Sequence, residues 1–270
     1  MIGVFDSGVG GLTVLKEFLR ELPKYDYMYL GDSARTPYGN RSRESVMEFT
    51  KQGIDFLFEK GCTLIIIACN TASATVLREI QEEYLRKPKV TDKKILGVLR
   101  PVVEEVAGIS KKGRIGVVGT KGTINSGSYE LELKHLKKDI KVFGQACPLL
   151  VPLIEEGYLH KPATHMILRE YLRSLKSKNI DTLILGCTHY PALYSEFKKM
   201  IGSRVNVPHP GEIVARSLKD YLKRHDEIEG RLTKKGGRHF YTTDDPERFK
   251  EIGKIFIGNS IKKVEKCQVS

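Results

Sequence analysis

The sequence predicts an α/β protein made of two doubly wound parallel-sheet domains. Short apolar runs alternate with amphipathic helical segments along most of the chain, which is the pattern of strand–helix–strand units. One strand–cysteine–helix pattern also occurs twice, around Cys69 and around Cys187, 118 residues apart. A chain of 270 residues can form one large domain or two ordinary ones, and the repeated pattern favours two.

The repeated pattern places each cysteine where a buried strand ends. Runs of Leu and Ile over residues 64–67 and 183–185 precede the two cysteines, and such runs are typical of strands buried on both faces of a parallel sheet. Apolar spacing near 3.6 residues predicts a helix after each cysteine, through residues 76–84 and 193–201.

The carboxyl edge of a parallel sheet is where ligands bind, because helix N-termini there offer unpaired N–H groups. The same position lowers the pKa of a thiol below its free value of about 8.5. For one such cysteine alone, packing as a small hydrophobe is the alternative. Two copies, each followed by hydroxyl or amide groups and one by a histidine, favour paired chemistry.

The N-terminal segment predicts a strand over residues 2–5, a glycine-rich turn over residues 6–11 and a helix through residues 14–22. The glycines allow a ligand to approach backbone N–H groups, but their spacing is not that of the dinucleotide-binding fingerprint. Asp6, at the end of the strand, is placed to act as an acid, a base or a hydrogen-bond partner. Capping of the following helix is the alternative role for Asp6.

Further elements follow from the same patterns. Strands are expected over residues 27–30, 95–98, 114–119 and 142–145, with weaker candidates over 204–207, 239–242 and 261–264. Helices are expected through residues 46–57, 129–136, 213–222 and 249–256. Three segments are candidates for function: the long polar loop 31–40, the hydroxyl-rich turn 120–123, and the stretch 147–157, in which two acids mark either a helix end or a site.

The composition favours a cytoplasmic protein with reduced thiols. Its five cysteines include no Cys-x-x-Cys pair, so they indicate neither a disulfide framework nor a zinc site. The N-terminus lacks the basic and apolar regions of a signal peptide, and no apolar run approaches the roughly 18 residues that span a bilayer. We therefore expect no membrane association.

The formal net charge of +12 favours anionic partners. The basic residues are scattered among acids and have no aromatic platform beside them, so a specific nucleic-acid surface is not expected. A solvated, lysine-rich surface explains the charge, and it would also attract an acidic small molecule.

Several motifs together identify a family resemblance. They are Phe5-Asp6-Ser7-Gly8-Val9-Gly10-Gly11, Gly31-Asp32 with Pro37-Tyr38-Gly39, Ala68-Cys69-Asn70-Thr71-Ala72, Gly119-Thr120 with Thr123, Cys147-Pro148-Leu149 through Glu155, and Gly186-Cys187-Thr188-His189-Tyr190-Pro191. With these motifs the chain resembles the glutamate racemases of the cofactor-independent aspartate/glutamate racemase superfamily, nearly from end to end.

The resemblance implies two α/β domains related by a pseudo-twofold axis. Glutamate would be enclosed between them, with one cysteine on each face of its α-carbon. The first domain would comprise residues 1–96 plus 210–270, because the chain crosses over and returns, and the second residues 97–209. The activity implied is interconversion of L- and D-glutamate, with D-glutamate used in bacterial peptidoglycan.

The resemblance also implies roles for individual residues. Cys69 would be the base for D-glutamate, assisted by Asp6, and Cys187 the base for L-glutamate, assisted by His189 and Glu155. Glu156 is the alternative to Glu155. The substrate-binding residues would be Ser7, Pro37, Tyr38, Gly39, Asn70, Thr71, Thr120, Thr123 and Thr188. Among these, Asn70, Thr71 and Thr188 would hold the α-carboxylate and amine, and Ser7, Tyr38 and Gly39 the side-chain carboxylate. The stretch 207–211 receives no role.

We expect neither an organic cofactor nor a metal. No lysine stands in a recognisable pyridoxal-phosphate setting, and no His/Asp cluster has metal-ligand spacing. Two other classes stay open: a racemase acting on aspartate or hydantoins, and a non-enzymatic protein that binds anions or nucleic acid. The oligomeric state also stays open, with a homodimer as one option.

Overall fold

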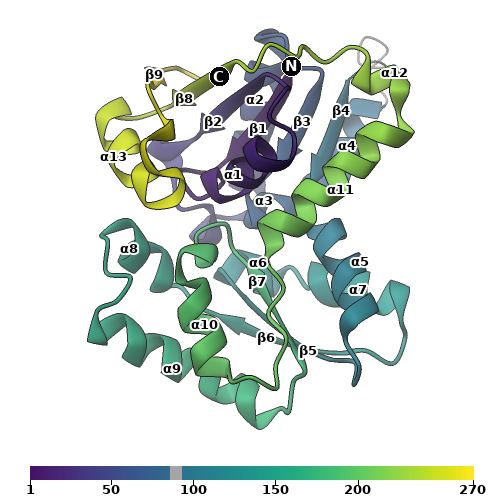
Figure 1. The fold of residues 1–270 in the computed structure, drawn as a ribbon, viewed down its shortest axis with the longest axis vertical. Helices are drawn as coiled ribbons and strands as arrows, with labels where there is room; N and C mark the ends of the chain where they lie inside the picture. Colours follow the sequence, from purple (N-terminus) through teal and green to yellow (C-terminus); the bar gives the residue numbers. More distant parts are fainter. Residues whose placement is uncertain (86–92) are drawn as a thin grey trace.

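The structure is a computed structural model that describes residues 1–85 and 93–270, and it contains two parallel sheets (Figure 1). The first has the strand order β4-β3-β1-β2-β8-β9, from β1 (Ile2–Asp6), β2 (Tyr27–Gly31), β3 (Leu64–Ile67), β4 (Lys94–Gly97), β8 (Arg238–Thr242) and β9 (Glu265–Lys266). The second has the order β6-β5-β7, from β5 (Arg114–Gly119), β6 (Lys141–Ala146) and β7 (Thr182–Gly186). The predicted α/β class with parallel sheets is confirmed.

Helices surround both sheets. The α-helices are α1 (Leu12–Glu21), α2 (Arg43–Glu59), α3 (Asn70–Thr75), α4 (Leu77–Leu85), α5 (Leu99–Ile109), α6 (Lys121–Asn125), α7 (Ser128–Leu136), α8 (Leu150–Glu155), α9 (Pro162–Ser177), α10 (Tyr194–Ile201), α11 (Pro210–Arg224), α12 (Asp226–Glu229) and α13 (Pro246–Ile257). The described residues also contain the 3-10 helices η1 (Ser33–Arg35), η2 (Tyr38–Asn40), η4 (Tyr190–Leu193) and η5 (Gly258–Ser260).

The central strands of the first sheet, β1, β2 and β3, are covered on both faces because they are apolar. Successive strand side chains point to opposite faces, so β1 sends Val4 into the apolar cluster that contains Phe18 of α1, and Phe5 into the cluster that contains Ile54 of α2. All five residues of β1 are buried. Two-sided burial explains the continuous apolar runs and the doubly wound arrangement.

The strand register brings the predicted site residues to one edge. Asp6 pairs with Gly31 and Phe5 with Ile67, so Cys69 leaves β3 beside the end of β1. In the second sheet Gly119 pairs with Gly186, so Thr120 and Cys187 also leave neighbouring strands together.

The chain moves from the first sheet to the second and then returns. In Figure 1 the first sheet and both termini lie in the upper part of the molecule, and the second sheet lies in the lower part. The returning helix α11 packs against both α1 and α5, and β8 and β9 then join the first sheet. The strands β8 and β9 therefore complete the first sheet.

Two of the weaker strand predictions are wrong. Residues 204–207 form no strand, because only Asn206 makes a single bridge, to Thr182, before the prolines at 208 and 210 turn the chain into α11. The strand expected over residues 261–264 lies instead at Glu265–Lys266. The strand expected over residues 239–242 is confirmed as β8.

The helices expected through residues 76–84 and 193–201 are confirmed as α4 and α10, but a shorter helix lies between each cysteine and the expected helix. After Cys69 the chain forms two helices, α3 and α4, separated at Val76, whose φ of −134° is not helical. After Cys187 the 3-10 helix η4 precedes α10, and Pro191 lies in its first turn. Only Cys69 therefore directly precedes an α-helix.

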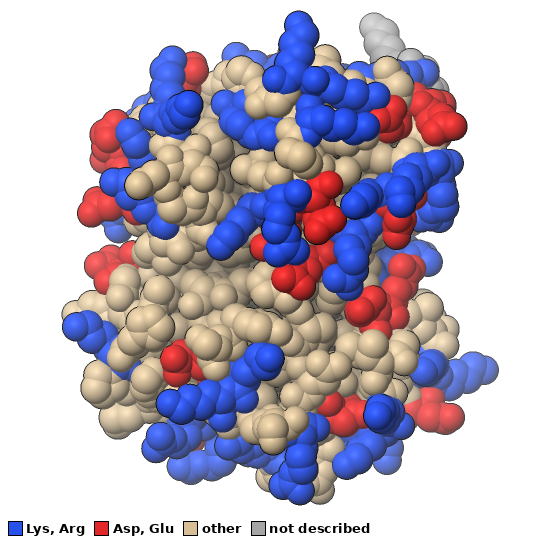
Figure 2. Space-filling view, viewed as in Figure 1, with Lys and Arg blue, Asp and Glu red and all other residues tan. Residues whose placement is uncertain are grey.

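The surface charge is mixed over the face seen in Figure 2, where Lys and Arg are spread widely with Asp and Glu between them. Many of these side chains are paired, as in Arg100 with Glu104 at 2.9 Å and Lys134 with Glu130 at 2.6 Å. Within residues 1–85 and 93–270, no helix has the length and apolar character that a membrane crossing requires.

Candidate active site

The carboxyl edges of the two sheets meet at the glycine-rich turn after β1. A methyl group added at Gly10 would lie 2.4 Å from Nδ1 of His189 and 2.4 Å from Oγ1 of Thr188. The Thr188 hydroxyl also donates to Oδ1 of Asp6, at 3.3 Å. The turn that follows Asp6 therefore contacts the turn that follows Cys187.

Cys69 is held as a neutral thiol by its surroundings. Its side chain is 4% exposed, and Sγ lies 3.5 Å from Oγ of Ser7. Burial, with the nearby Asp6 carboxylate, raises the pKa of Cys69 to about 12. The expectation of a lowered thiol pKa is wrong at this position, because loss of water outweighs the stabilisation offered by the short helix α3.

Cys187 has a different partner. Its Sγ lies 3.9 Å from Nδ1 of His189, and Nε2 of the same ring lies 2.8 Å from Oε1 of Glu155. Burial lowers the pKa of His189, but its interactions with Cys187 and Glu155 outweigh burial and raise it to about 10. His189 is thus a cation at neutral pH, and its ring lies beside the Cys187 sulfur.

This geometry distinguishes Glu155 from its neighbour Glu156 as the acid that meets His189. Glu155 is the last residue of α8 and contacts the imidazole of His189. Glu156 instead lies 4.0 Å from Arg248, on the surface. The structure brings Glu155, not Glu156, to the cysteine site.

Asp6 is fully buried and does not cap the following helix. Its Oδ2 accepts the N–H of Gly8 at 3.0 Å, whereas Gly11 begins α1 without a side-chain cap. Burial raises the pKa of Asp6, although the positive His189 and the hydrogen bond from Gly8 oppose the increase. The carboxylate also accepts the N–H of Gly11, so Asp6 both faces the site and holds the turn that leads into α1.

Three threonine hydroxyls link the first cysteine loop to the second sheet. Oγ1 of Thr71 lies 2.9 Å from Oγ1 of Thr120, which lies 3.0 Å from Oγ1 of Thr123. The loop that contains Gly39 also packs here, since a Cβ at Gly39 would lie 2.5 Å from Cβ of Thr120. These predicted substrate-binding residues therefore form one cluster across the two sheet units.

The predicted loop 31–40 contains an anchor, Asp32, which belongs to one of the motifs but received no role from the sequence. Asp32 is fully buried and accepts hydrogen bonds from the hydroxyl of Tyr38, from Arg35 and from Thr243. Pro37 is the residue just before η2, the 3-10 helix that holds Tyr38 and Gly39. Thr243 is 211 residues away in sequence, so local pattern could not have revealed this contact.

The stretch 207–211 starts a helix. Nδ1 of His209 accepts the N–H of Glu212 at 3.4 Å, and Pro210 is the first residue of α11. Burial lowers the pKa of His209, which favours the neutral ring that this cap requires.

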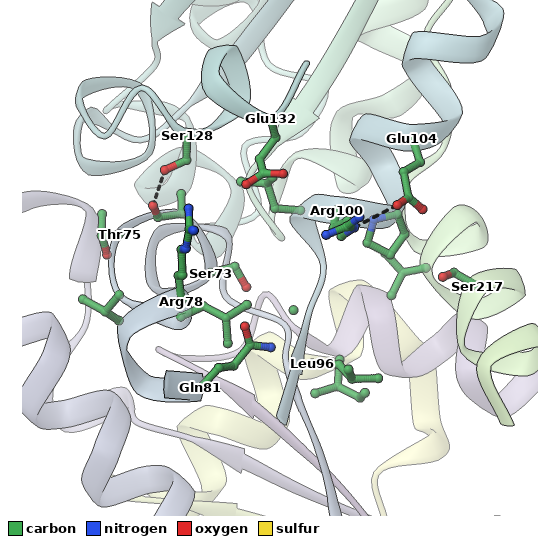
Figure 3. Close-up of a pocket in the computed structure, with 18 of the residues that line it drawn as sticks. Ser73, Thr75, Arg78, Gln81, Leu96, Arg100, Glu104, Ser128, Glu132 and Ser217 are labelled. Atoms are coloured by element: carbon green, nitrogen blue, oxygen red, sulfur yellow. Dashed lines mark hydrogen bonds and ion pairs between the residues drawn. The ribbon is translucent and has the colours of Figure 1, made fainter. Parts of the chain in front are cut away.

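A cavity of about 1260 Å³ lies apart from the cysteines (Figure 3). Helices α4, α5, α7 and α11 contribute to its lining, and neither Cys69 nor Cys187 is part of it. Figure 3 shows Ser128 bonded to the carbonyl of Ala74 and Arg100 paired with Glu104 at its rim. Arg43 with Glu79, Arg78 with Glu82 and Arg100 with Glu104 are ion pairs within its lining. The cysteine site instead concentrates groups with perturbed pKa values, which marks it as the better candidate.

The geometry agrees with what is known of related sequences. The Asp/Glu/Hydantoin racemase family matches residues 2–218. The chain belongs to this family. It is 40% identical over 260 residues to the glutamate racemase of Geobacter metallireducens, covering 96% of this chain and 93% of that protein.

Solved structures of family members have the same fold. The glutamate racemase isoform RacE1 of Bacillus anthracis superposes with a TM-score of 0.90 at 37% identity, covering 99% of this chain and 97% of the other. The glutamate racemase of Francisella tularensis, solved with D-glutamate, gives 0.88 at 34% identity, with the same coverage. Among the residues described here, no group of three or more His, Cys, Asp or Glu side chains is arranged to hold a metal.

We expect Gly10→Ala to disrupt the site. The added methyl would overlap His189 and Thr188, so the two turns must separate. A displacement of about 1 Å lowers the catalytic rate on the order of 100-fold. Overpacking lowers the free energy of unfolding by roughly 1–3 kcal/mol. Racemase assays and urea unfolding would measure both effects. Gly108→Ala, which meets nothing within 4 Å, is the matched control; equal activity in the two variants would contradict the proposed packing.

Protonation of His189 should make stability depend on pH. Because its pKa rises from 6.5 to about 10 on folding, the imidazolium contributes stability that is fully present below pH 6.5 and is lost as pH rises through about 10. The difference in unfolding free energy between the unaltered protein and His189→Gln should therefore shrink from pH 6 to pH 10. A difference that stays constant across this range would show that the ring is neutral in the folded state.

Proposed function

We propose that this chain interconverts L- and D-glutamate by proton transfer between two cysteines, without a cofactor. The observation that carries the proposal is that Cys69 and Cys187 leave the ends of two parallel sheets whose edges are in contact. Relatives of nearly equal length are glutamate racemases, and the Francisella structure contains D-glutamate. Family membership argues against the non-enzymatic alternative.

The first step for L-glutamate would be removal of the α-proton by the Cys187 thiolate. The His189 cation, 3.9 Å from the sulfur, stabilises that thiolate before the transfer, and Glu155 holds the ring in place. The C–H bond breaks, the proton passes to the Cys187 sulfur, and the electron pair remains on the α-carbon and its carboxylate.

The second step would deliver a proton to the opposite face. The raised pKa of Cys69 keeps this residue protonated, so its thiol is ready to donate. In the resting protein, the Cys187 side of the site would stabilise a thiolate and the Cys69 side would hold a neutral thiol. This is the arrangement needed to act on L-glutamate. In the reverse direction Cys69 acts as the base, and Asp6, with its raised pKa, assists as a proton acceptor.

Neutral donors would hold the two carboxylates of the substrate. Asn70, Thr71 and Thr188 would contact the α-carboxylate and amine, and Ser7 with the Tyr38-Gly39 loop would contact the side-chain carboxylate. Pro37, Thr120 and Thr123 would complete the pocket. Developing charge on the α-carboxylate is stabilised by such donors and by helix N–H groups.

The domains implied by this proposal are residues 1–96 plus 210–270 and residues 97–209, with the substrate between them. The protein would work in the cytoplasm and supply D-glutamate for peptidoglycan, with no specific nucleic-acid partner. An assay with glutamate and with aspartate, without added cofactor, separates this activity from that of another racemase in the family.

Replacing either cysteine should abolish racemisation. Cys69→Ala and Cys187→Ala each remove one proton carrier, and loss of a general base lowers the rate by about 100-fold to 10,000-fold. Polarimetry would follow the reaction, and circular dichroism the fold. Cys267→Ala, a partly exposed cysteine near the C-terminus, is the control and should keep full activity. Full activity in either site variant would remove the two-base mechanism.

Isotope incorporation should distinguish two bases from one. In D2O, the early D-glutamate formed from L-glutamate should carry deuterium at the α-carbon, because the Cys69 sulfur has exchanged with solvent. The remaining L-glutamate should stay largely protiated. Mass spectrometry of the separated enantiomers measures both, and substantial protium in the early product would indicate a single base that serves both faces.

A further inference from the structure

Tyr129 lies between the two cysteine loops. It belongs to α7, on the side of the second sheet, and is 4% exposed. Its hydroxyl accepts a hydrogen bond from Nδ2 of Asn70 at 3.0 Å. Its ring packs against Gly186, where an added Cβ would lie 3.2 Å from Cε2. Tyr129 thus contacts the residue after Cys69 and the residue before Cys187.

Thr13 makes the corresponding contact from the other side. It belongs to α1, beside the first sheet, and is 7% exposed. Its Oγ1 lies 2.8 Å from the carbonyl oxygen of Thr188 and 2.9 Å from that of Gly10. The hydroxyl therefore ties the Cys187 loop to the glycine-rich turn.

The two contacts are reciprocal. Asn70 directly follows Cys69 in the first sheet and is bonded by a residue of the second unit, Tyr129. Thr188 directly follows Cys187 in the second sheet and is bonded by a residue of the first unit, Thr13. Each cysteine loop is therefore fixed by a buried hydroxyl from the opposite unit.

We propose that Thr13 and Tyr129 are a reciprocal pair of positioning residues, each of which sets the place of one cysteine relative to the substrate α-carbon. The inference rests on the proposed racemase function. Neither hydroxyl needs to exchange a proton with substrate. Each acts through the backbone or side chain next to a sulfur, and proton transfer depends steeply on that sulfur's distance from the α-carbon.

The pairing predicts that the two residues act on different steps. Loss of the Thr13 hydroxyl displaces the Cys187 loop, so transfer at Cys187 becomes the slower step. Loss of the Tyr129 hydroxyl displaces the Cys69 loop, so transfer at Cys69 becomes the slower step. Because L- and D-glutamate are equally stable, kcat/KM must fall by the same factor in both directions for any variant, and that factor alone cannot assign the step.

Primary deuterium isotope effects show which of the two proton transfers has become the slower step. With α-deuterated L-glutamate, the C–D bond breaks at Cys187 and the deuterium passes to that sulfur, while Cys69 supplies the new hydrogen. With α-deuterated D-glutamate, the C–D bond breaks at Cys69. The isotope effect on kcat/KM for each enantiomer therefore reports how far its own cysteine limits the rate.

Thr13→Val and Tyr129→Phe, which remove the hydroxyls and keep the buried bulk, should both lower kcat/KM by about 10-fold or more. Thr13→Val should raise the isotope effect for L-glutamate and lower it for D-glutamate. Tyr129→Phe should do the opposite. Shifts in the same direction for both variants, or no shifts, would overturn the proposal.

Two further measurements exclude a merely structural effect. Tyr27→Phe is the matched control, because Tyr27 is buried and its hydroxyl donates to the carbonyl of Leu22 at 3.1 Å, away from both cysteines. It should lose stability to the same extent as the other two variants, because one buried hydroxyl contact is removed in each, and keep its isotope effects. In a double-mutant cycle, Tyr129→Phe should cause little further loss of kcat/KM in a protein that already carries Asn70→Ala, since both substitutions remove the same contact.

The outcomes separate the two proposals. If the unaltered protein does not racemise glutamate, the proposed function fails. If it does, and Thr13→Val and Tyr129→Phe behave like Tyr27→Phe, the function stands and the positioning pair is refuted.

Discussion

Contact between the turn after β1 and the turn after β7 is the constraint on which the site depends. Gly10 has no side chain. Because no Cβ is present there, Thr188 and His189 can pack against the first sheet. That packing buries Asp6 beside the Thr188 hydroxyl and places the His189 cation where it affects the pKa of Asp6. The electrostatics of both cysteines therefore follow from a steric requirement at one glycine.

The site is also closed by hydroxyl groups, which suit a contact between two units that must admit a ligand. A hydroxyl both donates and accepts, so Thr71, Thr120 and Thr123 can satisfy one another across the interface. The same groups can turn to donate to a carboxylate without leaving a buried donor unpaired. A lysine or arginine in their place would need a permanent anionic partner.

Sequence alone predicted the parts of the site that depend on local pattern. The apolar runs that end at Cys69 and Cys187 are strands, and the parallel register brings Asp6 and Thr120 to the corresponding edges. Contacts between distant segments could not be predicted this way. The hydrogen bond of Asn70 with Tyr129 spans 59 positions and that of Thr13 with Thr188 spans 175, and no periodicity encodes either.

The direction of the Cys69 pKa shift was also beyond local reasoning. A cysteine at the start of a helix suggests a lowered pKa, but the sign depends on how completely neighbouring segments exclude water. Likewise, Glu155 and Glu156 are equivalent in sequence, and only the end of α8 decides which carboxylate meets His189. Burial and orientation are properties of the packed molecule.

Charge balance explains why the two sides of the site differ. Glutamate would bring two carboxylates to a buried region that already contains Glu155 and Asp6. Burial raises the pKa values of Asp6 and Cys69, which limits further negative charge, and the raised pKa of His189 supplies a compensating cation. In the proposed mechanism, one negative charge would move from the Cys187 sulfur to the Cys69 sulfur during a turnover without a change in the total. Because His189 would stabilise that charge on one side only, the two directions of the proposed reaction would begin from different protonation states of the same pair. Equal stability of the two enantiomers therefore does not require the two cysteines to have the same surroundings, and the structure gives them different ones.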